Sequence, residues 1–248
     1  MKVEEISPYG EREEKGEEVE QMFDSISRRY DMMNAAMSLG QHKRWRNIAL
    51  KAAIRSLPQK DNLKILDVAT GTGDVAFKLH KLFPEALITG IDLSDGMLDI
   101  AREKLNSLPA GEQKFLAFGK GDSLGMPFHQ GEFNFITVAY GVRNFSDLRK
   151  GIDEMRRVLA PGGVLCIIEL STPRSFLTRT AYDLYAGKLI PIIGKWVSGD
   201  KRAYSYLPES IAACPKREDM AALLYASGFS HVEWKSLSFG ALTYYVAR

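Results

Sequence analysis

Three aspartates each stand at the end of a short apolar run: Asp67 in KILDVATG, Asp92 in TGIDLSDG and Asp122 in AFGKGDSL. If the three runs are strands of one parallel sheet, their carboxyl ends lie along a single edge, where α/β folds bind ligands. A carboxylate at that edge accepts hydrogen bonds from hydroxyl and amino groups or balances a cation. The aspartates therefore predict a ligand site along one edge of a parallel sheet.

A glycine turn follows the first of these aspartates. Gly71, Thr72 and Gly73 open the run GTGDVA, which fits the pattern G-x-G-x-x-A, and Asp92 stands about twenty residues further on. The same pattern marks the phosphate turn of dinucleotide-binding folds, and a glycine turn also occurs where a strand merely passes into a helix. The turn alone leaves a dinucleotide, another nucleoside and no ligand as alternatives.

Asp67 favours one of these alternatives. In a dinucleotide turn the pyrophosphate lies on the amino terminus of the following helix, and a fixed carboxylate four residues before Gly71 would repel it. A ligand that carries an ammonium or a sulfonium, such as S-adenosylmethionine, suits the same carboxylate. We therefore expect Asp67, Gly71 and Gly73 to border a site for a cationic nucleoside.

The other two aspartates extend this hypothesis. Asp92 is placed to accept hydrogen bonds from both hydroxyls of a ribose, and Asp122, with Ser123 beside it, from an adenine amino group. Taken singly, each is more often a helix cap or a turn residue. Their positions after successive runs favour the ligand site.

Short apolar runs alternate with helical stretches from residue 63 onward. The runs lie at 63–69, 87–93, 114–122, 133–140 and 163–170, and the helical stretches at about 74–83, 95–107 and 146–159. This alternation predicts an α/β fold with a parallel sheet covered by helices on both faces. Pro161-Gly162-Gly163 predicts a sharp turn ahead of the fifth run, and two runs around Gly240 predict a terminal β-hairpin.

The composition is that of a soluble globular protein, since 45% of the 248 residues are hydrophobic and 26% are charged. A net charge of +2 gives no pull toward nucleic acid, and no apolar run is long enough to span a membrane. We expect a cytoplasmic protein with Cys166 and Cys214 reduced. Residues 1–20 predict a disordered acidic tail, and residues 21–248 a single domain that starts with a helical cap over 21–60.

Four longer segments resemble the signatures of one family. They are YDMMNAAMSLGQHKRW (30–45), YGVRNFSD (140–147), RVLAPGGVLCIIELSTP (157–173) and YSYLPESI (204–211). Over about residues 20–248 the chain resembles the UbiE/MenG-type quinone C-methyltransferases, which are class I S-adenosylmethionine-dependent methyltransferases. The resemblance implies a Rossmann-like fold with a seven-stranded, mostly parallel sheet, an antiparallel terminal hairpin and a helical insertion over 175–211.

The resemblance also implies a cofactor and a reaction. Contacts with S-adenosylmethionine carry over to Thr72, Asp92, Asp122 and Ser123, whereas Ala139 replaces a serine that some members have, so a contact there is absent or made by the backbone. The implied reaction moves a methyl group to a ring carbon of a prenylated hydroquinone. Demethylmenaquinol becomes menaquinol; the alternative substrate is the 2-polyprenyl-6-methoxy-benzoquinol of ubiquinone biosynthesis.

Such a reaction needs a group that stabilises a phenolate, because the phenolate charge makes the ring carbon nucleophilic. Arg143 and Asn144 are the first candidates for this role, and Tyr30 or His42 is a candidate to relay the proton. Two alternatives stay open. Packing against Trp45 accounts equally well for His42, and a surface ion pair is the alternative role of Arg143.

The insertion over 175–211 is aromatic and apolar, with basic residues between its apolar ones. It is the expected place for the isoprenoid chain and for peripheral contact with a membrane. A helical subdomain packed on the sheet, or the surface of a homo-oligomer, explains the same composition.

Two other classes of protein remain as alternatives. An NAD-dependent oxidoreductase would share the glycine turn, but Asp67 and the lack of a Tyr-x-x-x-Lys pair disfavour it. A cofactor-binding protein without catalysis is disfavoured by Arg143 and Asn144. The four histidines and two cysteines lack the spacing of metal ligands, so we expect no metal.

Overall fold

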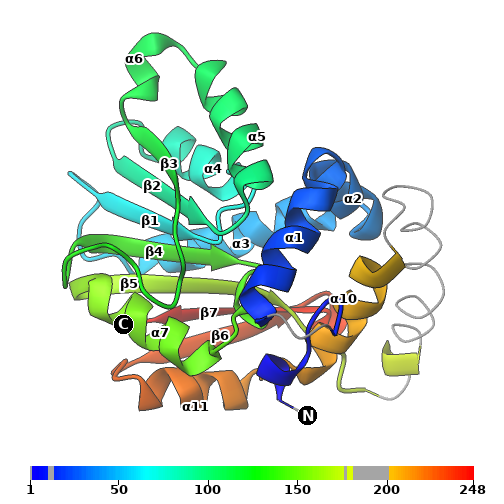
Figure 1. Ribbon diagram of the computed structural model, residues 1–248. Coiled ribbons are helices and arrows are strands. Elements are labelled where there is room, and N and C mark those ends of the chain that lie inside the picture. The colour runs from blue at the N-terminus through cyan, green and yellow to red at the C-terminus, as the bar shows by residue number, and fades with distance from the viewer. Residues whose placement is uncertain (1, 11–13, 176–177, 181–200) are drawn as a thin grey trace.

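A seven-stranded sheet forms the centre of the computed structural model, which describes residues 2–10, 14–175, 178–180 and 201–248 (Figure 1). Its strands are β1 (Lys64–Val68), β2 (Leu87–Asp92), β3 (Leu116–Lys120), β4 (Phe133–Ala139), β5 (Leu159–Leu170), β6 (Val232–Leu237) and β7 (Leu242–Ala247). Their order is β3-β2-β1-β4-β5-β7-β6, and β7 runs antiparallel to both β5 and β6. The predicted fold class and terminal hairpin are confirmed.

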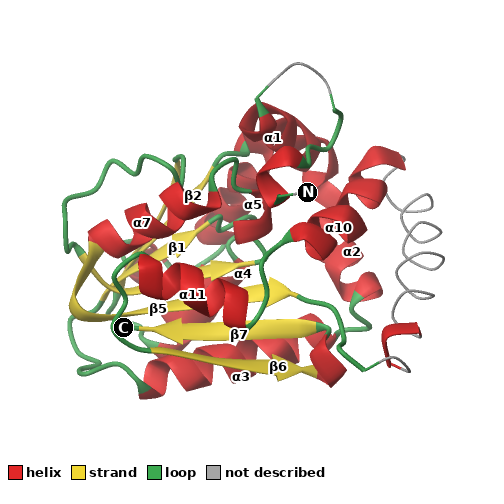
Figure 2. Ribbon diagram, turned by 90° about the horizontal axis from the view of Figure 1, so that it is seen from below, coloured by secondary structure: helices red, strands yellow, loops and turns green. Residues whose placement is uncertain are grey.

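Helices cover both faces of the sheet. The helices are α1 (Lys15–Ile26), α2 (Tyr30–Met37), α3 (Gln41–Arg55), α4 (Asp74–Leu82), α5 (Asp95–Asn106), α6 (Ala110–Gln113), α7 (Leu148–Val158), α10 (Lys201–Ala213) and α11 (Glu218–Ala226). In Figure 2, α7 and α11 lie on one face and α3 on the other. Each face has its own core: Leu66 and Ile136 pack with α7 and α11, whereas Ile65 and Phe135 pack with α3 and α4. Burial on both faces explains why these strands read as continuous apolar runs.

Strand β5 begins earlier than the sequence suggests. Leu159 pairs with Phe133, and the next pairing in the ladder joins Val164 to Phe135. The predicted turn, Pro161 to Gly163, is therefore an interruption within the strand rather than a loop before it. Extra residues on one strand produce this kind of bulge without ending the pairing.

The amino-terminal segment differs from the disordered tail expected for residues 1–20. Val3 and Ile6 are buried, and α1 begins at Lys15. The Glu18 carboxylate is buried too and accepts hydrogen bonds from the backbone N–H groups of Tyr9 and Gly10, at 2.6 and 3.0 Å. The acidic segment forms an amphipathic helix in which Glu18 and Glu20 have partners, so the expectation of disorder was wrong for the described part of this segment.

Helix α1 crosses the carboxyl ends of the strands beside α2 and α10 (Figure 1). Three contacts hold it there. Lys15 Nζ donates to the carbonyl oxygen of Arg143 at 3.1 Å, and Glu20 forms an ion pair with Lys120 at 2.6 Å. The Asp24 carboxylate accepts from Ser94 Oγ at 2.6 Å. We call α1 the roof helix, because it covers the edge where the three aspartates were expected.

The predicted insertion is described only in part. Helix α10 forms its end, while residues 176–177 and 181–200 lie outside the described residues. Within the described ranges, no helix combines the length and the apolar character needed to cross a membrane.

Candidate functional site

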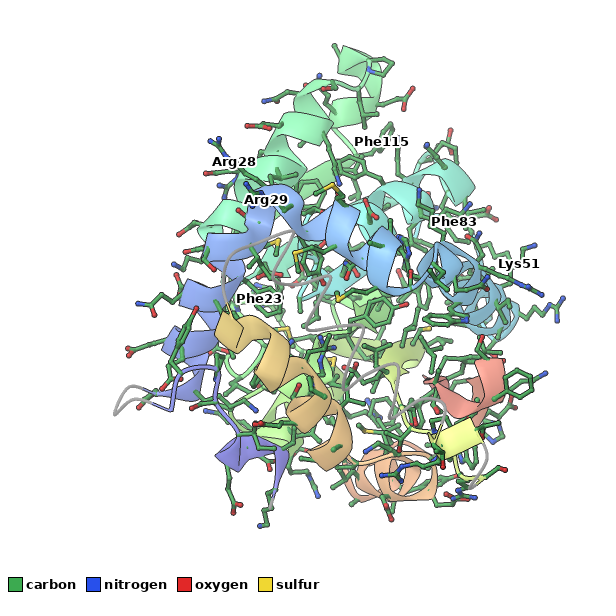
Figure 3. The ribbon with its side chains drawn as sticks, turned by 90° about the vertical axis from the view of Figure 1, so that its right-hand side faces the viewer. Phe23, Arg28, Arg29, Lys51, Phe83 and Phe115 are labelled. Atoms are coloured by element: carbon green, nitrogen blue, oxygen red, sulfur yellow. The ribbon has the colours of Figure 1, made fainter. Side chains whose placement is uncertain are left out.

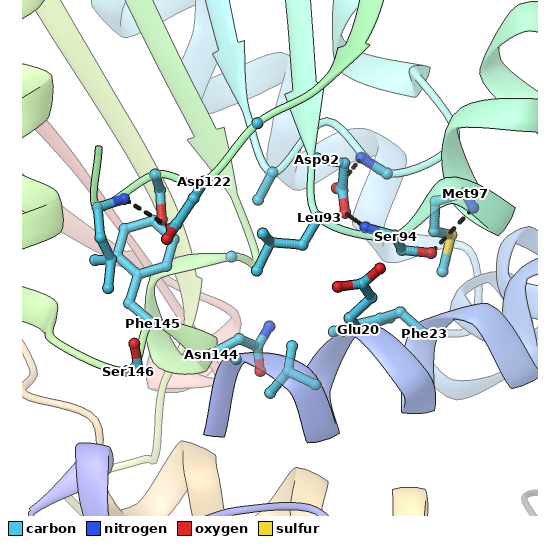
Figure 4. Close-up of a pocket in the computed structure, with 18 of the residues that line it drawn as sticks. Glu20, Phe23, Asp92, Leu93, Ser94, Met97, Asp122, Asn144, Phe145 and Ser146 are labelled. Atoms are coloured by element: carbon cyan, nitrogen blue, oxygen red, sulfur yellow. Dashed lines mark hydrogen bonds between the residues drawn. The ribbon is translucent and has the colours of Figure 1, made fainter. Parts of the chain in front are cut away.

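A polar cleft of about 350 Å³ lies at the carboxyl edge of the sheet, under the roof helix. Its lining includes Glu17, Glu20, Phe23, Tyr30, Gly71, Asp92, Ser94, Asp122, Ser123, Tyr140 and Asn144. In Figure 4, Asp92 and Asp122 belong to the sheet side of the cleft, and Glu20 and Phe23 face them from α1. The structure therefore brings together two of the three predicted aspartates, with Ser123 and Asn144.

Asp92 ties the end of β2 to the glycine turn. Its Oδ2 accepts the backbone N–H of Gly71 at 2.8 Å and its Oδ1 that of Ser94 at 3.0 Å. Burial raises the pKa of this carboxyl above its ordinary value, and the backbone donors oppose that rise. Asp92 thus holds the turn in place while it borders the cleft.

Asp122 and Ser123 form another part of the lining, after β3. Asp122 Oδ1 accepts the backbone N–H of Leu124 at 2.9 Å, so the turn fixes the carboxylate although the residue is exposed. Ser123 is buried. These positions offer acceptors to a flat polar ligand such as a purine.

An apolar cavity of about 510 Å³ lies on the other side of Tyr30 and Tyr140, which border both spaces. It is lined by Met22, Phe23, Ile26, Met33, Met37, Leu39, Trp45, Leu170, Tyr206, Leu207, Ile211 and Phe239, with Asn34, Ser38, His42, Arg143 and Ser238 among its polar residues. The helical cap expected over 21–60 thus borders a second space, which was not predicted. The methionines and aromatic residues of the cap were the sequence feature that could have indicated this apolar cavity.

Arg143 is a buried member of this cavity and not a surface ion-pair residue. Its Nη1 donates to Glu169 Oε1 at 2.8 Å and to the Tyr140 carbonyl at 2.5 Å, and both side chains of the pair are over nine-tenths buried. Arg143 Nε is buried without a partner among the described residues. The pKa of Arg143 is raised: burial opposes its charge, but the Glu169 carboxylate, together with Tyr30 and Tyr206, more than compensates. A guanidinium thus stays charged in an apolar wall.

Asn144 and Tyr30 are two further predicted residues at this site. Asn144 Oδ1 accepts from Tyr206 Oη at 3.0 Å, and its Nδ2 donates to the Tyr140 carbonyl at 3.3 Å. Tyr30 borders both the cleft and the cavity, and burial raises the pKa of its hydroxyl. A tyrosine with a raised pKa is a hydrogen-bond donor rather than a base at neutral pH.

His42 is buried in the wall of the apolar cavity, with Nδ1 2.6 Å from Ser38 Oγ. That hydroxyl also lies 2.5 Å from the Asn34 carbonyl, to which it donates. Nδ1 must therefore carry a hydrogen and donate to Ser38, which leaves Nε2 as an acceptor. Burial, together with nearby cations, lowers the pKa of His42, so the ring is neutral at pH 7. Trp45 donates to Ser238 Oγ at 2.8 Å and shares the cavity wall with His42.

Three residues of the glycine turn region lie away from the polar cleft. Thr72 Oγ1 donates to Asp31 at 2.7 Å, and Asp67, 1% exposed, accepts from two threonine hydroxyls. Gly73 has a φ of +81°, and a Cβ there would lie 2.8 Å from the Phe77 ring. Gly73 is therefore needed for packing and backbone conformation rather than to line the cleft.

Glu169 and Tyr140 were missed in the sequence. Glu169 interrupts the apolar run LCIIEL, and a charge inside a buried strand signals a buried partner. Tyr140 has a φ of +62°, rare for an aromatic residue, and its hydroxyl is buried without a partner among the described residues. Local sequence gives no sign of that backbone conformation.

This sheet order, with a ligand cleft at its carboxyl edge, defines the class I S-adenosylmethionine-dependent methyltransferase fold. A solved methyltransferase from Thermotoga maritima, described as a possible histamine N-methyltransferase, superposes with a TM-score of 0.61 at 17% identity, covering 92% of this chain and 98% of that one. The profile of the ubiE/COQ5 methyltransferase family matches residues 11–248. The chain belongs to the ubiE/COQ5 methyltransferase family, which confirms the resemblance.

Two curated relatives match almost the whole of this chain. The demethylmenaquinone methyltransferase of Bacteroides fragilis is 44% identical over 98% of this chain and 97% of its own length. The ubiquinone/menaquinone biosynthesis C-methyltransferase UbiE of Geotalea uraniireducens is 37% identical over 94% of this chain and 97% of its own.

Proposed function

We propose that this protein transfers a methyl group from S-adenosylmethionine to a ring carbon of a prenylated hydroquinone, converting demethylmenaquinol to menaquinol. One observation carries the proposal: a polar cleft and an apolar cavity share a wall made by Tyr30 and Tyr140. A polar nucleoside and a lipid-like acceptor would meet at that wall. The names of the relatives from Bacteroides and Geotalea support the same reaction class.

The polar cleft fits the cofactor. Asp92 would accept from a ribose, and Asp122 and Ser123 would contact the adenine. Gly71, with a φ of +57°, holds the turn beside them in a conformation that a side chain would strain. When bound, S-adenosylmethionine supplies an electrophilic methyl group. The cleft residues orient it, and the roof helix excludes water.

Arg143 carries the electrostatic part of the mechanism. Its charge is held by Glu169, yet its Nη2 forms no hydrogen bond within the described part of the chain. A free guanidinium N–H in an apolar wall lowers the pKa of a quinol hydroxyl beside it and stabilises the phenolate. Asn144, fixed by Tyr206, adds a polar group at the same wall.

His42 Nε2 is the proposed acceptor of the quinol proton, directly or through water. The neutral ring, with Nδ1–H bound to Ser38, is oriented as a base. Tyr30 contributes a hydroxyl donor at the same junction.

The decisive test is an assay with methyl-labelled S-adenosylmethionine and two reduced acceptors in detergent, demethylmenaquinol and 2-polyprenyl-6-methoxy-benzoquinol. We expect label on the ring carbon of demethylmenaquinol. Label on the benzoquinol alone would assign the ubiquinone reaction. Absence of label on both acceptors, with cofactor bound, would refute the proposal.

We also propose peripheral contact with a membrane at the mouth of the apolar cavity. Leu39 and Phe239 line the cavity, yet 76% and 85% of their surfaces are exposed. Figure 3 views the side of α1, α2 and α10, with Arg28 and Arg29 at the turn between α1 and α2. Exposed apolar side chains at the mouth of a cavity suit contact with lipid, and basic side chains favour anionic lipid.

Flotation with anionic liposomes tests this contact. The Leu39→Ser/Phe239→Ser variant should lose most of the floated fraction, because two exposed apolar side chains no longer enter the lipid. Leu82→Ser/Leu87→Ser, at two other exposed leucines, is the matched control and should float like the wild type. Equal flotation of all three proteins would exclude this surface, and a shift in size-exclusion volume of the first variant would favour a homo-oligomer interface instead.

A further inference from the structure

Lys15, the first residue of the roof helix, carries a buried ammonium group. The residue is 7% exposed, and no carboxylate pairs with its Nζ within the described ranges. A cation in the first turn of a helix opposes the helix dipole, so local structure disfavours a lysine here. Burial lowers the pKa of Lys15 from 10.5 to about 8, although the charge of Glu4 opposes this effect. A lysine that is buried without an ion pair, against local preference, points to a role set by tertiary structure.

The ammonium of Lys15 binds two backbone carbonyls from segments far apart in the sequence. Nζ donates to the carbonyl oxygen of Val3 at 2.6 Å and to that of Arg143 at 3.1 Å. Val3 begins one 3₁₀ turn, η1 (Val3–Glu5), and Arg143 lies in another, η3 (Val142–Asn144), which is packed against it. One side chain thus joins the amino-terminal segment, the roof helix and the segment that carries Arg143.

The position of Arg143 depends on contacts with both sides of its backbone. Its N–H donates to Glu169 Oε2 at 3.4 Å, and its guanidinium binds Glu169 and the Tyr140 carbonyl. Its own carbonyl accepts from Lys15, and no other donor to that carbonyl is found in the part of the chain that the structure describes. Glu169 therefore holds the N–H and the side chain, whereas Lys15 holds the carbonyl.

We propose that Lys15 is a positioning residue for the methyl transfer: its ammonium holds the carbonyl of Arg143, and this keeps the guanidinium in place in the wall of the apolar cavity. The inference rests on the proposed role of Arg143 and deepens it. Lys15 itself lines neither the polar cleft nor the apolar cavity. It acts through geometry, because a misplacement of about 1 Å at a reacting centre costs on the order of 10²-fold in rate.

A double-variant cycle tests whether Lys15 acts through Arg143. Lys15→Met keeps the length of the side chain and removes its donors, so turnover of the quinol reaction should fall by about 10- to 30-fold, with the KM for the quinol within about threefold of the wild type. In the Arg143→Met/Glu169→Gln background, which has no guanidinium to position, the same change should cost less than about twofold.

Lys120→Met is the matched control, because Lys120 also holds the roof helix but does not contact the segment that carries Arg143. Whatever its effect on turnover, the factor should be the same in both backgrounds. An equal loss from Lys15→Met in both backgrounds would show a general structural role and overturn the inference, as would wild-type turnover in Lys15→Met.

Hydrogen exchange provides a second measurement that needs no substrate. The amides of residues 140–147 should exchange about 10-fold faster in Lys15→Met than in the wild type or in Lys120→Met, because the η3 turn opens more often. Those of α7 should keep their protection. Unchanged exchange over 140–147, or faster exchange throughout the chain, would overturn the inference.

Failure of the inference and failure of the proposed function give different results. Wild-type protein that binds S-adenosylhomocysteine but methylates neither quinol would refute the proposed function, and the exchange experiment would still show whether Lys15 holds the segment of Arg143. Quinol methylation that does not depend on Lys15 would overturn the inference alone.

Discussion

Turnover of the proposed quinol reaction should fall by about 10²- to 10³-fold when Arg143 is replaced by methionine, the range for loss of one preorganised donor to a developing charge. Cofactor affinity should stay near the wild-type value, because Arg143 lines the apolar cavity and not the polar cleft. Initial rates with saturating cofactor and calorimetry with S-adenosylhomocysteine measure the two quantities.

Glu169, the buried partner of Arg143, makes the turnover of the single variant harder to interpret. Removing Arg143 alone leaves Glu169 buried and unpaired, which costs about 3–5 kcal/mol of unfolding free energy. The Arg143→Met/Glu169→Gln variant removes both charges and should recover most of that stability without recovering turnover. If turnover returned together with stability, Arg143 would have only a structural role.

Asp67→Asn should change stability and binding in opposite directions. Burial raises the pKa of Asp67 from 3.8 to about 6, although Thr70 and Thr137 donate to it and Arg46 lies nearby. A raised pKa means that the favourable contribution to folding is present below pH 3.8 and is lost as the pH rises through 6. At pH 7.5 the ionised group therefore costs about 3 kcal/mol, from two pKa units, and asparagine removes that cost.

Melting curves and binding isotherms over a pH series check this expectation. The variant should melt several degrees higher than the wild type at pH 7.5 and at about the same temperature at pH 4. Affinity for S-adenosylhomocysteine should rise in the wild type as Asp67 ionises between pH 5 and 7.5, and stay low and flat in Asp67→Asn. A variant that binds as tightly as the wild type throughout would show that no cation approaches Asp67.

Much of the fold follows from local pattern. The runs that became β1, β2 and β4 are apolar on both faces because helices cover both, and α5 begins at a serine cap, Ser94, whose hydroxyl accepts the N–H of Met97. These signals act over a few residues, so the sequence alone suffices to predict them. The roof helix was predicted only from residue 21, as part of the helical cap. Its first turns escaped prediction because Lys15, where the helix begins, contacts the Arg143 carbonyl more than a hundred residues away.

Some features of the candidate site could likewise be predicted from the sequence, and others could not. Asp92 and Asp122 were predictable because the end of each strand is visible in the sequence and parallel strands end at one edge. The pairing of Arg143 with Glu169, and the separation of Asp67 from the polar cleft, depend on tertiary packing that no local spacing encodes. The apolar cavity likewise forms from α1, α2, α3, α10 and the turn at Phe239 together.

The roof helix has a consequence for the order of events in a catalytic cycle. The roof helix borders both the polar cleft and the apolar cavity. Val19 and Glu20 line the cleft, Met22 and Ile26 line the cavity, and Phe23 lines both. A single displacement of that helix would open the cleft and the cavity together. The spent donor and the methylated product would then be exchanged for new substrates during the same open interval. One of the contacts that hold this helix is the exposed ion pair of Glu20 with Lys120, which salt weakens. The length of the open interval should therefore respond to ionic strength.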